Sequence, residues 1–471
     1  MASPDNAEYT TTITTRGFSS CIRIIWQCLR TLHEKSWCKL VNTTKMVIKL
    51  EQDDPRRVIH SFKVGLALVL ISILQHIRPT FYAFGDNILW AVLTVALVLE
   101  FSVGATLGKG LNRILATWLA GALGVGTRSI ANLCGQKGEA VLTTIFVFVI
   151  AGSVTFMRFS PRLKARYDYG FIIFILTFCM VSLSDDKERA MLKLAQERLL
   201  TIIIGSFVAV IVCICICPVW IGQDLHNQIA ANMEKIAHFF EGFSDEYLKK
   251  SENTEVVHDR SFLHRYKSVL SSKSSEETMA VLARWEPRHG GFRFRHPWKQ
   301  YLKIGNLIRL CAYNIEVLIA CLPHSDQVSL NYEVGNKIKE SCTIISSECG
   351  KTLKEASLMV KHMTMSSMHN SHVANAKNAI QTIKSILRTN PWEGVDYDEI
   401  IQVSTLASLL IDVVNCIQNI CEAVDELASL AKFQPSQLLH HRGTVVQPVD
   451  DSVHVIAIIE TPPILELRNE N

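Results

Sequence analysis

The sequence lacks the short motifs that identify most enzymes and metal centres. It contains no His-Glu-x-x-His and no Gly-x-Ser-x-Gly, and its 14 cysteines include no Cys-x-x-Cys pair of the kind that binds zinc. The run Gly104–Gly110 resembles a phosphate-binding loop. Its spacing is one residue short, and the Ser or Thr that should follow the lysine is missing. We therefore predict no enzyme activity, no catalytic residues, no cofactor, no metal site and no nucleic-acid partner.

The N-terminus also lacks the apolar segment of a cleaved signal peptide. Its first twenty residues are polar and rich in threonine. Any insertion into a membrane would then have to be directed by the first spanning helix itself.

Long apolar runs are what the first half of the chain does contain. A helix rises about 1.5 Å per residue, so crossing a hydrocarbon core of roughly 30 Å takes about 20 mostly apolar residues. Six runs are long enough to enter or cross a bilayer, and the second and sixth are the clearest. They lie near Val58–Ile77, Ile88–Val103, Leu111–Gly126, Ala140–Met157, Tyr169–Leu183 and Leu199–Trp220. The chain is therefore predicted to be a polytopic membrane protein.

Positive charge near the ends of these runs predicts their orientation. Nine basic residues precede the first run, and the connections after the third and fifth runs are sparse in charge or balanced. The basic connections hold Lys109 and Arg113 between the second and third runs, and Arg158, Arg162, Lys164 and Arg166 between the fourth and fifth. The positive-inside rule then predicts both termini in the cytosol and an even number of crossings.

The chain divides into a basic and a mildly acidic part. Residues 1–221 carry 23 Lys and Arg against 14 Asp and Glu, whereas the rest carry 25 against 30. From residue 222 onward, apolar residues recur at helical spacing without sustained β alternation. We predict an all-α fold, with a polytopic membrane domain of six transmembrane helices followed by a cytosolic helical bundle domain. The expected divisions are a cytosolic N-terminal arm over 1–55, the transmembrane domain over 56–221, the helical domain over 222–433 and a flexible tail over 434–471.

Several ionised residues stand inside or beside the apolar runs, where they are costly unless they face a cavity or a partner. Glu100 lies in the second run, and Lys109 and Arg113 follow at i and i+4, on one face if that region is helical. Lys63 lies at the entrance to the first run, and Arg198 directly precedes the sixth. Each cation alone could instead extend to the lipid headgroups. Together they are typical of an anion path, which needs basic side chains that bind weakly enough to release the ion.

Two aromatic motifs in the second half are candidates for gating or coupling. In Trp285-Glu286-Pro287-Arg288-His289-Gly290, the proline ends a helix and the glycine permits a sharp turn. Trp220 ends the sixth run as an interfacial anchor. Each motif is either a joint between the helical bundle and a gate, or a purely structural turn. Just before the first motif, five serines form a polar stretch that a regulatory kinase would modify: Ser268, Ser271, Ser272, Ser274 and Ser275.

Five motifs that occur in order resemble the plant aluminium-activated malate transporter family. They are Asp54–Gly65, Trp90–Leu107, Lys109–Arg113, Tyr167–Gly170 and Trp285–Gly290, and the resemblance spans roughly residues 54–320. Within that family the chain resembles the plasma-membrane, guard-cell rapid-type anion channel branch.

This resemblance implies a passive anion channel, voltage- and anion-regulated, that conducts malate, chloride, nitrate and sulfate. It further implies a homodimer embedded in membrane lipids, in the plasma membrane or, alternatively, the vacuolar membrane. The basic pore residues of the family correspond to Lys109, Arg113 and Arg198, and less directly to Arg128 and Lys63. The gating or coupling candidates are Glu100, Trp220, Trp285, Glu286 and Pro287. The acidic cluster Asp185, Asp186 and Glu188 lies where extracellular cation sensing would occur, or is an ordinary solvated loop.

Two other functions remain open from the sequence. A proton-coupled dicarboxylate carrier could use the same cations, with His60 or Glu100 relaying protons. A membrane-anchored scaffold would instead use the acidic helical half to bind partners. Six helices with polar residues inside them are more than anchorage requires, which makes the scaffold the weakest of the three.

Overall fold

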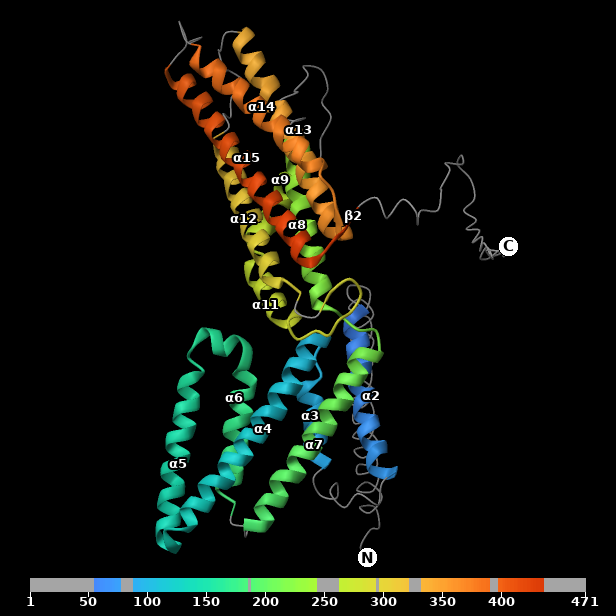
Figure 1. The fold of residues 1–471 in the computed structure, drawn as a ribbon, viewed down its shortest axis with the longest axis vertical. Coiled ribbons are helices and arrows are strands. Elements are labelled where there is room, and N and C mark those ends of the chain that lie inside the picture. Colours follow the sequence, from blue (N-terminus) through green and yellow to red (C-terminus); the bar gives the residue numbers. More distant parts are fainter. Residues whose placement is uncertain are drawn as a thin grey trace, which may run out of the picture.

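The computed structural model describes residues 55–77, 88–184, 188–243, 262–293, 296–321, 332–389 and 397–435. Their helices form two groups placed end to end (Figure 1). We call α2–α7 the N-terminal group and α8–α15 the C-terminal group. The predicted arm over 1–55, except Pro55, lies outside the described residues, and so does the predicted tail beyond residue 435.

The N-terminal group is a set of long helices that run alternately toward and away from the C-terminal group (Figure 1). The start of α2 and the end of α7 therefore both face that group. The helices are α2 (Pro55–Ile77), α3 (Ile88–Val98), α4 (Val103–Asn132), α5 (Gly135–Met157), α6 (Pro161–Ser182) and α7 (Glu188–Cys215).

This group presents its apolar side chains outward, as a membrane domain does. Phe148 and Phe156 of α5 are 80% and 77% exposed, and Trp118 of α4 is 57% exposed. In water, burying such apolar area inside the protein would be strongly favourable. Its exposure therefore indicates that hydrocarbon surrounds this group of helices. In the described part of the chain, the helices long and apolar enough to span a membrane are α2, α4, α5, α6, α7 and α15.

Helix α3 is shorter than predicted, and this moves Glu100 out of the second helix. α3 ends at Val98, and the chain turns over residues 99–102 before α4 begins. The turn is fixed by Ser102, whose side chain accepts a hydrogen bond from the Ala105 backbone at 3.3 Å, an N-cap. The Thr106 hydroxyl also accepts from the Glu100 backbone at 3.0 Å. The prediction of Glu100 within the second helix is wrong for this reason.

Other helices extend beyond their apolar runs. Because α4 begins at Val103, Lys109 and Arg113 lie inside it and not in a connection, and Gly104–Gly110 is helical. Because α7 begins at Glu188, Arg198 lies almost three turns inside it and does not open it. Polar Lys, Glu and Arg residues are good helix formers, so a helix continues past the point where its hydropathy falls. α6 likewise takes Lys164 and Arg166 into its first turns.

The C-terminal group is a bundle of long helices with three short ones at its side. Its helices are α8 (Ile221–Phe243), α9 (Phe262–Arg265), α10 (Lys267–Leu270), α11 (Lys273–Ala283), α12 (Trp298–Ala320), α13 (Tyr332–His362), α14 (Met368–Arg388) and α15 (Tyr397–Ala431). Two two-residue strands, β1 (Thr364–Met365) and β2 (Gln434–Pro435), pair in parallel. The predicted tail thus begins with a paired segment at 434–435.

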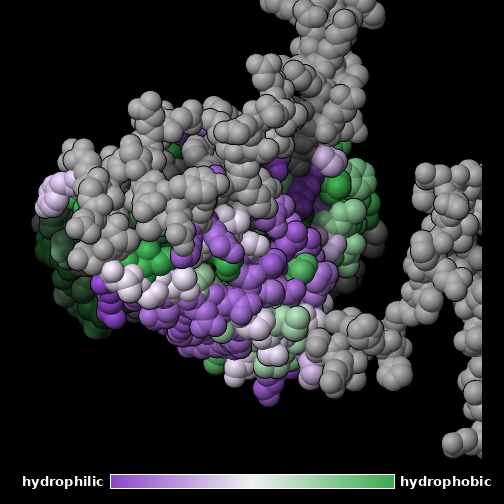
Figure 2. Space-filling view, turned by 90° about the horizontal axis from the view of Figure 1, so that it is seen from above, coloured by the Kyte–Doolittle hydropathy of each residue, from purple (hydrophilic) through white to green (hydrophobic). Residues whose placement is uncertain are grey.

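Helix α15 is apolar because it faces the core of this bundle. Leu410, Val413, Ile417 and Val424 are at most 2% exposed, and α15 packs against α12, α13 and α14. Seen from the end of this group, the molecule is mainly hydrophilic over its centre, with hydrophobic surface at the edges of the view (Figure 2). The predicted fold class is confirmed: the chain is all-α, with a membrane domain followed by further helices.

Close packing inside the N-terminal group yields a test of this arrangement. A Cβ at Gly205 of α7 would lie 2.9 Å from the Ala91 carbonyl oxygen of α3, whereas a Cβ at Gly126 of α4 would meet nothing within 4 Å. Both sites are in helices, so the gain in helix propensity from alanine is the same for each. We expect Gly205→Ala to be less stable than Gly126→Ala by about 1–3 kcal/mol. Thermal unfolding midpoints in detergent measure the difference, and equal midpoints would contradict the α3–α7 contact.

Candidate functional site

Helix α4 packs along both α6 and α7, and we call these two lines of contact together the α4–α6–α7 seam. Small residues permit this approach: a Cβ at Gly124 of α4 would lie only 2.9 Å from Val181 Cγ1 of α6. A Cβ at Gly110 of α4 would lie 3.6 Å from Ser206 Cβ of α7. Basic residues of α4 and α7 meet in this seam.

Arg113 lies buried in the seam. Its side chain projects from α4, and the residue is 2% exposed. One terminal nitrogen donates a hydrogen bond to Tyr169 Oη of α6 at 2.8 Å, and Nε has no partner among the described residues. A buried guanidinium with five donors and one neutral acceptor retains capacity to bind an anion.

Arg198 is the second buried cation and comes from α7. The residue is 2% exposed, and its guanidinium carbon lies 3.8 Å from the centroid of the Trp90 ring of α3. A terminal nitrogen donates to Met180 Sδ, a weak acceptor, and Nε is unpartnered within the described residues. The aromatic face stabilises the cation without neutralising it.

The two arginines repel each other. Arg113 acts on the Arg198 guanidinium as a like charge, and among the described residues neither forms an ion pair with a carboxylate. Two buried cations without a counterion are costly, because transfer of a charge out of water carries a large desolvation penalty. An anion in contact with either guanidinium would offset its charge and satisfy its unmet hydrogen-bond donors.

Lys109 lies one turn from Arg113 on the same face of α4, as predicted from their i, i+4 spacing. Its ammonium pairs with the Glu100 carboxylate and lies 5.6 Å from the centroid of the Tyr169 ring. Both side chains of this pair are 37% exposed. Tyr169 therefore contacts both Lys109 and Arg113.

The remaining predicted cations lie nearer the two ends of the group. Lys63 of α2 is 1% exposed, and its ammonium donates to the carbonyl of Cys217 at 3.1 Å. Arg128, near the end of α4, pairs with Glu139 of α5 at 2.9 Å. Along α4, the interval from Lys109 to Arg128 corresponds to about 28 Å of helix rise, close to the thickness of a hydrocarbon core.

Unpaired hydroxyl groups accompany the cations. Within the described residues, four buried hydroxyls of the seam helices have no hydrogen-bond partner. They are Thr117 of α4, Thr177 and Ser182 of α6, and Ser206 of α7. Buried polar groups are almost always hydrogen-bonded, so unpaired ones indicate positions that water or a ligand would occupy.

The Trp285–Gly290 motif connects this seam to the C-terminal group. The Glu286 carboxylate accepts hydrogen bonds from the backbone nitrogens of Ile221 at 2.6 Å and Gly222 at 3.0 Å. These are the first residues of α8, so Glu286 caps that helix from a distant part of the chain. Pro287 follows it in the exposed loop. We call the motif together with residues 216–222 the joint.

Aromatic contacts complete the joint on both sides. The Trp220 ring stacks on the His289 ring at 3.8 Å between centroids, with planes 8° apart. The Trp285 ring lies 5.1 Å from the Arg166 guanidinium of α6. A Cβ at Gly108 of α4 would lie 3.1 Å from the same indole. The joint thus contacts α4 and α6 near the cations and α8 of the C-terminal group.

Burial sets the protonation states in the joint. It raises the pKa of Glu286 to about 7, although the two backbone hydrogen bonds oppose the shift and Asp224 adds to it. Burial lowers the pKa of His289, whose Nε2 lies 3.8 Å from the Glu286 carboxylate. The lowered pKa favours the neutral form of His289 beside the Glu286 carboxyl.

The structure brings together residues that the sequence interpretation did not assign. Tyr169, Trp90 and Arg166 have no role in the predicted site, yet each contacts a predicted residue. Tyr169 and Trp90 lie within motifs that resemble the family, and this was the only sign in the sequence that these residues belong to the site. Among the described residues no group of His, Cys, Asp or Glu side chains could hold a metal ion. Asp185 and Asp186 lie outside the described residues, and nothing is described of the Glu188 side chain.

Known proteins that are similar to this chain carry the same family name. The sequence profile described as "Aluminium activated malate transporter" matches residues 48–393 and 388–428. The chain is 47% identical over 423 residues to aluminum-activated malate transporter 2 of Arabidopsis thaliana, covering 87% of this chain and 84% of that protein. It is 40% identical to aluminum-activated malate transporter 1 of Triticum aestivum, over 81% and 84% of the two chains. Against aluminum-activated malate transporter 12 of Arabidopsis thaliana the identity is 37%, over 67% and 56%.

The Glu286 carboxyl predicts a pH dependence of stability. Its ordinary pKa of 4.5 rises to about 7 in the folded joint, so between these values the folded chain binds a proton that the unfolded chain does not. The free energy of unfolding should therefore fall as pH rises from 5 to 8, by on the order of 3 kcal/mol from this group. Glu286→Gln, a neutral isostere, should remove that component.

Thermal midpoints of the wild type and Glu286→Gln at pH 5.5 and 8 measure this effect. Glu277→Gln changes an exposed carboxyl of α11 and serves as the matched control. If the wild type and Glu286→Gln respond identically to pH, the joint does not hold a titrating carboxyl.

Proposed function

The chain belongs to the aluminium-activated malate transporter family, and from this premise we propose that it carries malate across a membrane as a passive anion channel. The names of its relatives support malate as the transported substrate. The channel mechanism is supported by the seam. We propose that Lys109, Arg113 and Arg198 line the conduction path, with Arg128 and Lys63 toward its two ends.

One observation carries the proposal: Arg113 and Arg198 are both 2% exposed, and among the described residues neither pairs with a carboxylate. A structural cation of a membrane domain would be neutralised or would reach the headgroups. These two are held by Tyr169, Trp90 and Met180, which leave the positive charge uncompensated. Such a site lowers the barrier for carboxylates.

Passage requires that the anion leave as readily as it enters. Tyr169 and Trp90 supply weak contacts, and Lys109 is partly neutralised by Glu100. The cations therefore differ in charge compensation. Lys109, nearer the joint, is paired with a carboxylate, whereas Arg113 and Arg198, within the seam, have no carboxylate partner in the described residues. This gradation favours brief binding over a trap. Chloride, nitrate and sulfate would follow the same path.

We extend the proposal to the assembly of the channel, its location and its response to voltage. Two copies form the channel, embedded in lipid through the outward apolar surface of α4 and α5, with both termini cytosolic. The plasma membrane is the proposed location, with the vacuolar membrane as the alternative. Charge moving in the membrane field contributes about 2.3 kcal/mol per charge per 100 mV, enough for voltage dependence.

The joint is proposed to couple the C-terminal group to the seam. Trp285 contacts α4 at Gly108, one residue before Lys109, and Glu286 holds the start of α8. A displacement of α8 would therefore move the helix that carries Lys109 and Arg113. Trp220 and Pro287 maintain the loop that transmits it.

A proton-coupled dicarboxylate carrier is the second candidate. His60 Nδ1 is buried without a partner in the described residues, and the Glu100 charge acts on the His60 ring. A histidine and a carboxylate so placed are components of a proton relay. The pairing of Glu100 with Lys109 argues against a free proton acceptor at this position.

Removing one uncompensated cation should reduce conduction. We expect Arg198→Gln to lower malate conductance at least about tenfold, because one charge at close range contributes several kcal/mol even in a partly screened site. Chloride conductance should fall less, since a monovalent ion loses half the interaction of a dianion. Currents through reconstituted protein measure both.

Lys164→Gln is the matched control, because it removes an exposed cation of α6 outside the seam. Unchanged malate and chloride currents in Arg198→Glu would exclude Arg198 from the path.

Channel and carrier differ in their reversal potentials. A passive channel should reverse at the potential set by the malate gradient alone, and a pH gradient at fixed malate dianion should leave it unchanged. A shift with the pH gradient, abolished in Glu100→Gln, would favour the carrier.

A further inference from the structure

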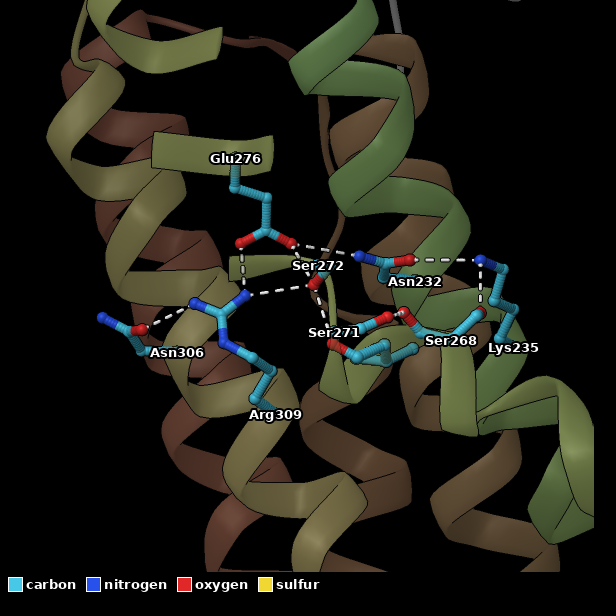
Figure 3. A network of polar contacts seen from close by, with 9 residues as sticks. Asn232, Lys235, Ser268, Ser271, Ser272, Glu276, Asn306 and Arg309 are labelled. Carbon is cyan, nitrogen blue, oxygen red and sulfur yellow. Dashed lines mark hydrogen bonds and ion pairs between the residues drawn. The ribbon is translucent and has the colours of Figure 1, made fainter. Parts of the chain in front are cut away.

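A serine placed against a lysine marks a further site in the C-terminal group. Ser268 of α10 is exposed, and its Oγ lies 3.0 Å from Lys235 Nζ of α8 (Figure 3). The same hydroxyl donates to the carbonyl of Arg265 at 2.8 Å. We infer that Ser268 is a phosphorylation site for a basophilic protein kinase, and that Lys235 binds the resulting phosphate.

The structure separates Ser268 from the other serines of the stretch. Ser272 is buried, with its hydroxyl 2.8 Å from the Glu276 carboxylate and 3.1 Å from the Arg309 guanidinium (Figure 3). It is inaccessible to a kinase. Ser274 and Ser275 are exposed, but in the described contacts their hydroxyls meet no cation. The Ser271 hydroxyl only donates to the carbonyl of Ser268, at 3.2 Å.

The sequence around Ser268 separates it in a second way. Arg265 stands three residues before it and Lys267 directly before it. Basic residues at these positions complement the acidic substrate groove of a basophilic kinase. Each of the other four serines has an uncharged residue three positions earlier. Ser268 is therefore the serine of this stretch that is exposed, follows basic residues in sequence and contacts a lysine side chain.

The reaction is an ordinary phosphoryl transfer with ATP as donor. Ser268 Oγ attacks the γ-phosphorus, a new Oγ–P bond forms, and the bond from that phosphorus to the β-phosphate oxygen breaks. ADP leaves, and the hydroxyl proton passes to the catalytic carboxylate of the kinase.

The phosphate would meet an already basic surface. A phosphoserine carries a charge of about −1.5 to −2 and three strong acceptor oxygens. Lys235 is in direct contact, and Arg265 and Lys267 are neighbours in sequence. The nearby Glu316 is already engaged by Lys267 at 3.6 Å and by the Tyr266 hydroxyl. Its charge is thus partly compensated.

A bound phosphate would fasten α10 to α8. Lys235 Nζ also lies 3.4 Å from Asn232 Oδ1, and the Asn232 amide donates to Glu276 at 3.2 Å (Figure 3). The modification therefore acts on the helix that Glu286 caps at the joint. This step rests on the proposed function, because ATP and kinases reach the site only if the C-terminal group is cytosolic.

The test uses purified full-length protein in detergent, ATP, and a serine kinase that selects arginine three residues before its acceptor. Mass spectrometry should find the phosphate at residue 268 in the wild type and in Ser275→Ala, and none there in Ser268→Ala. Ser268→Thr should restore it. Phosphorylation should raise the thermal midpoint of the wild type by about 2–4 °C, and Lys235→Ala should be phosphorylated without that rise.

Equal incorporation into Ser268→Ala and the wild type would overturn the site. An equal rise of the midpoint in Lys235→Ala would overturn the phosphate contact. Neither readout involves transport, so a protein that conducts no malate could still pass this test. A malate flux assay on phosphorylated and unmodified protein then reports whether the site regulates conduction.

Discussion

The structure depends on one electrostatic constraint, the burial of two guanidinium groups in a seam of apolar helices without a carboxylate partner in the described residues. Arg113 and Arg198 come from helices that run in opposite directions and pack against each other, with Gly110 of α4 beside Ser206 of α7. Tyr169 and Trp90 hold the two cations but leave their charge unmatched. An anion would offset this charge, and on that ground we proposed the seam as the conduction path.

A second constraint ties this seam to the rest of the chain. The first turn of α8 has backbone N–H groups that need acceptors, and Glu286 supplies them from a loop that also contacts α4 and α6. The same carboxylate is buried, which raises its pKa to about 7. One side chain thus serves as a helix cap, a structural link and a proton-binding group. The contacts of the joint support the proposal that the C-terminal group is coupled to the cations.

Much of the fold was predictable because membrane helices obey a strong local rule. Every backbone group must be hydrogen-bonded within lipid, so a long apolar run can only be a helix. The approximate positions of α2 and α5 follow from that rule, whereas those of α13–α15 follow from apolar residues that recur at helical spacing. Helix ends do not, because caps and polar helix formers decide them. For this reason Glu100 falls in a turn, and Arg198 lies inside α7 and not at its start.

The sequence by itself determined that cations stand among apolar helices, and its motifs indicated a family of anion transporters. It also placed Lys109 and Arg113 on one face, because helical periodicity is local. Only the tertiary structure decided which cations are neutralised: Lys109 and Arg128 meet carboxylates, whereas Arg113 and Arg198 meet an aromatic hydroxyl and an indole. Charge compensation depends on side chains from helices distant in sequence, and no local pattern encodes which of them will come into contact.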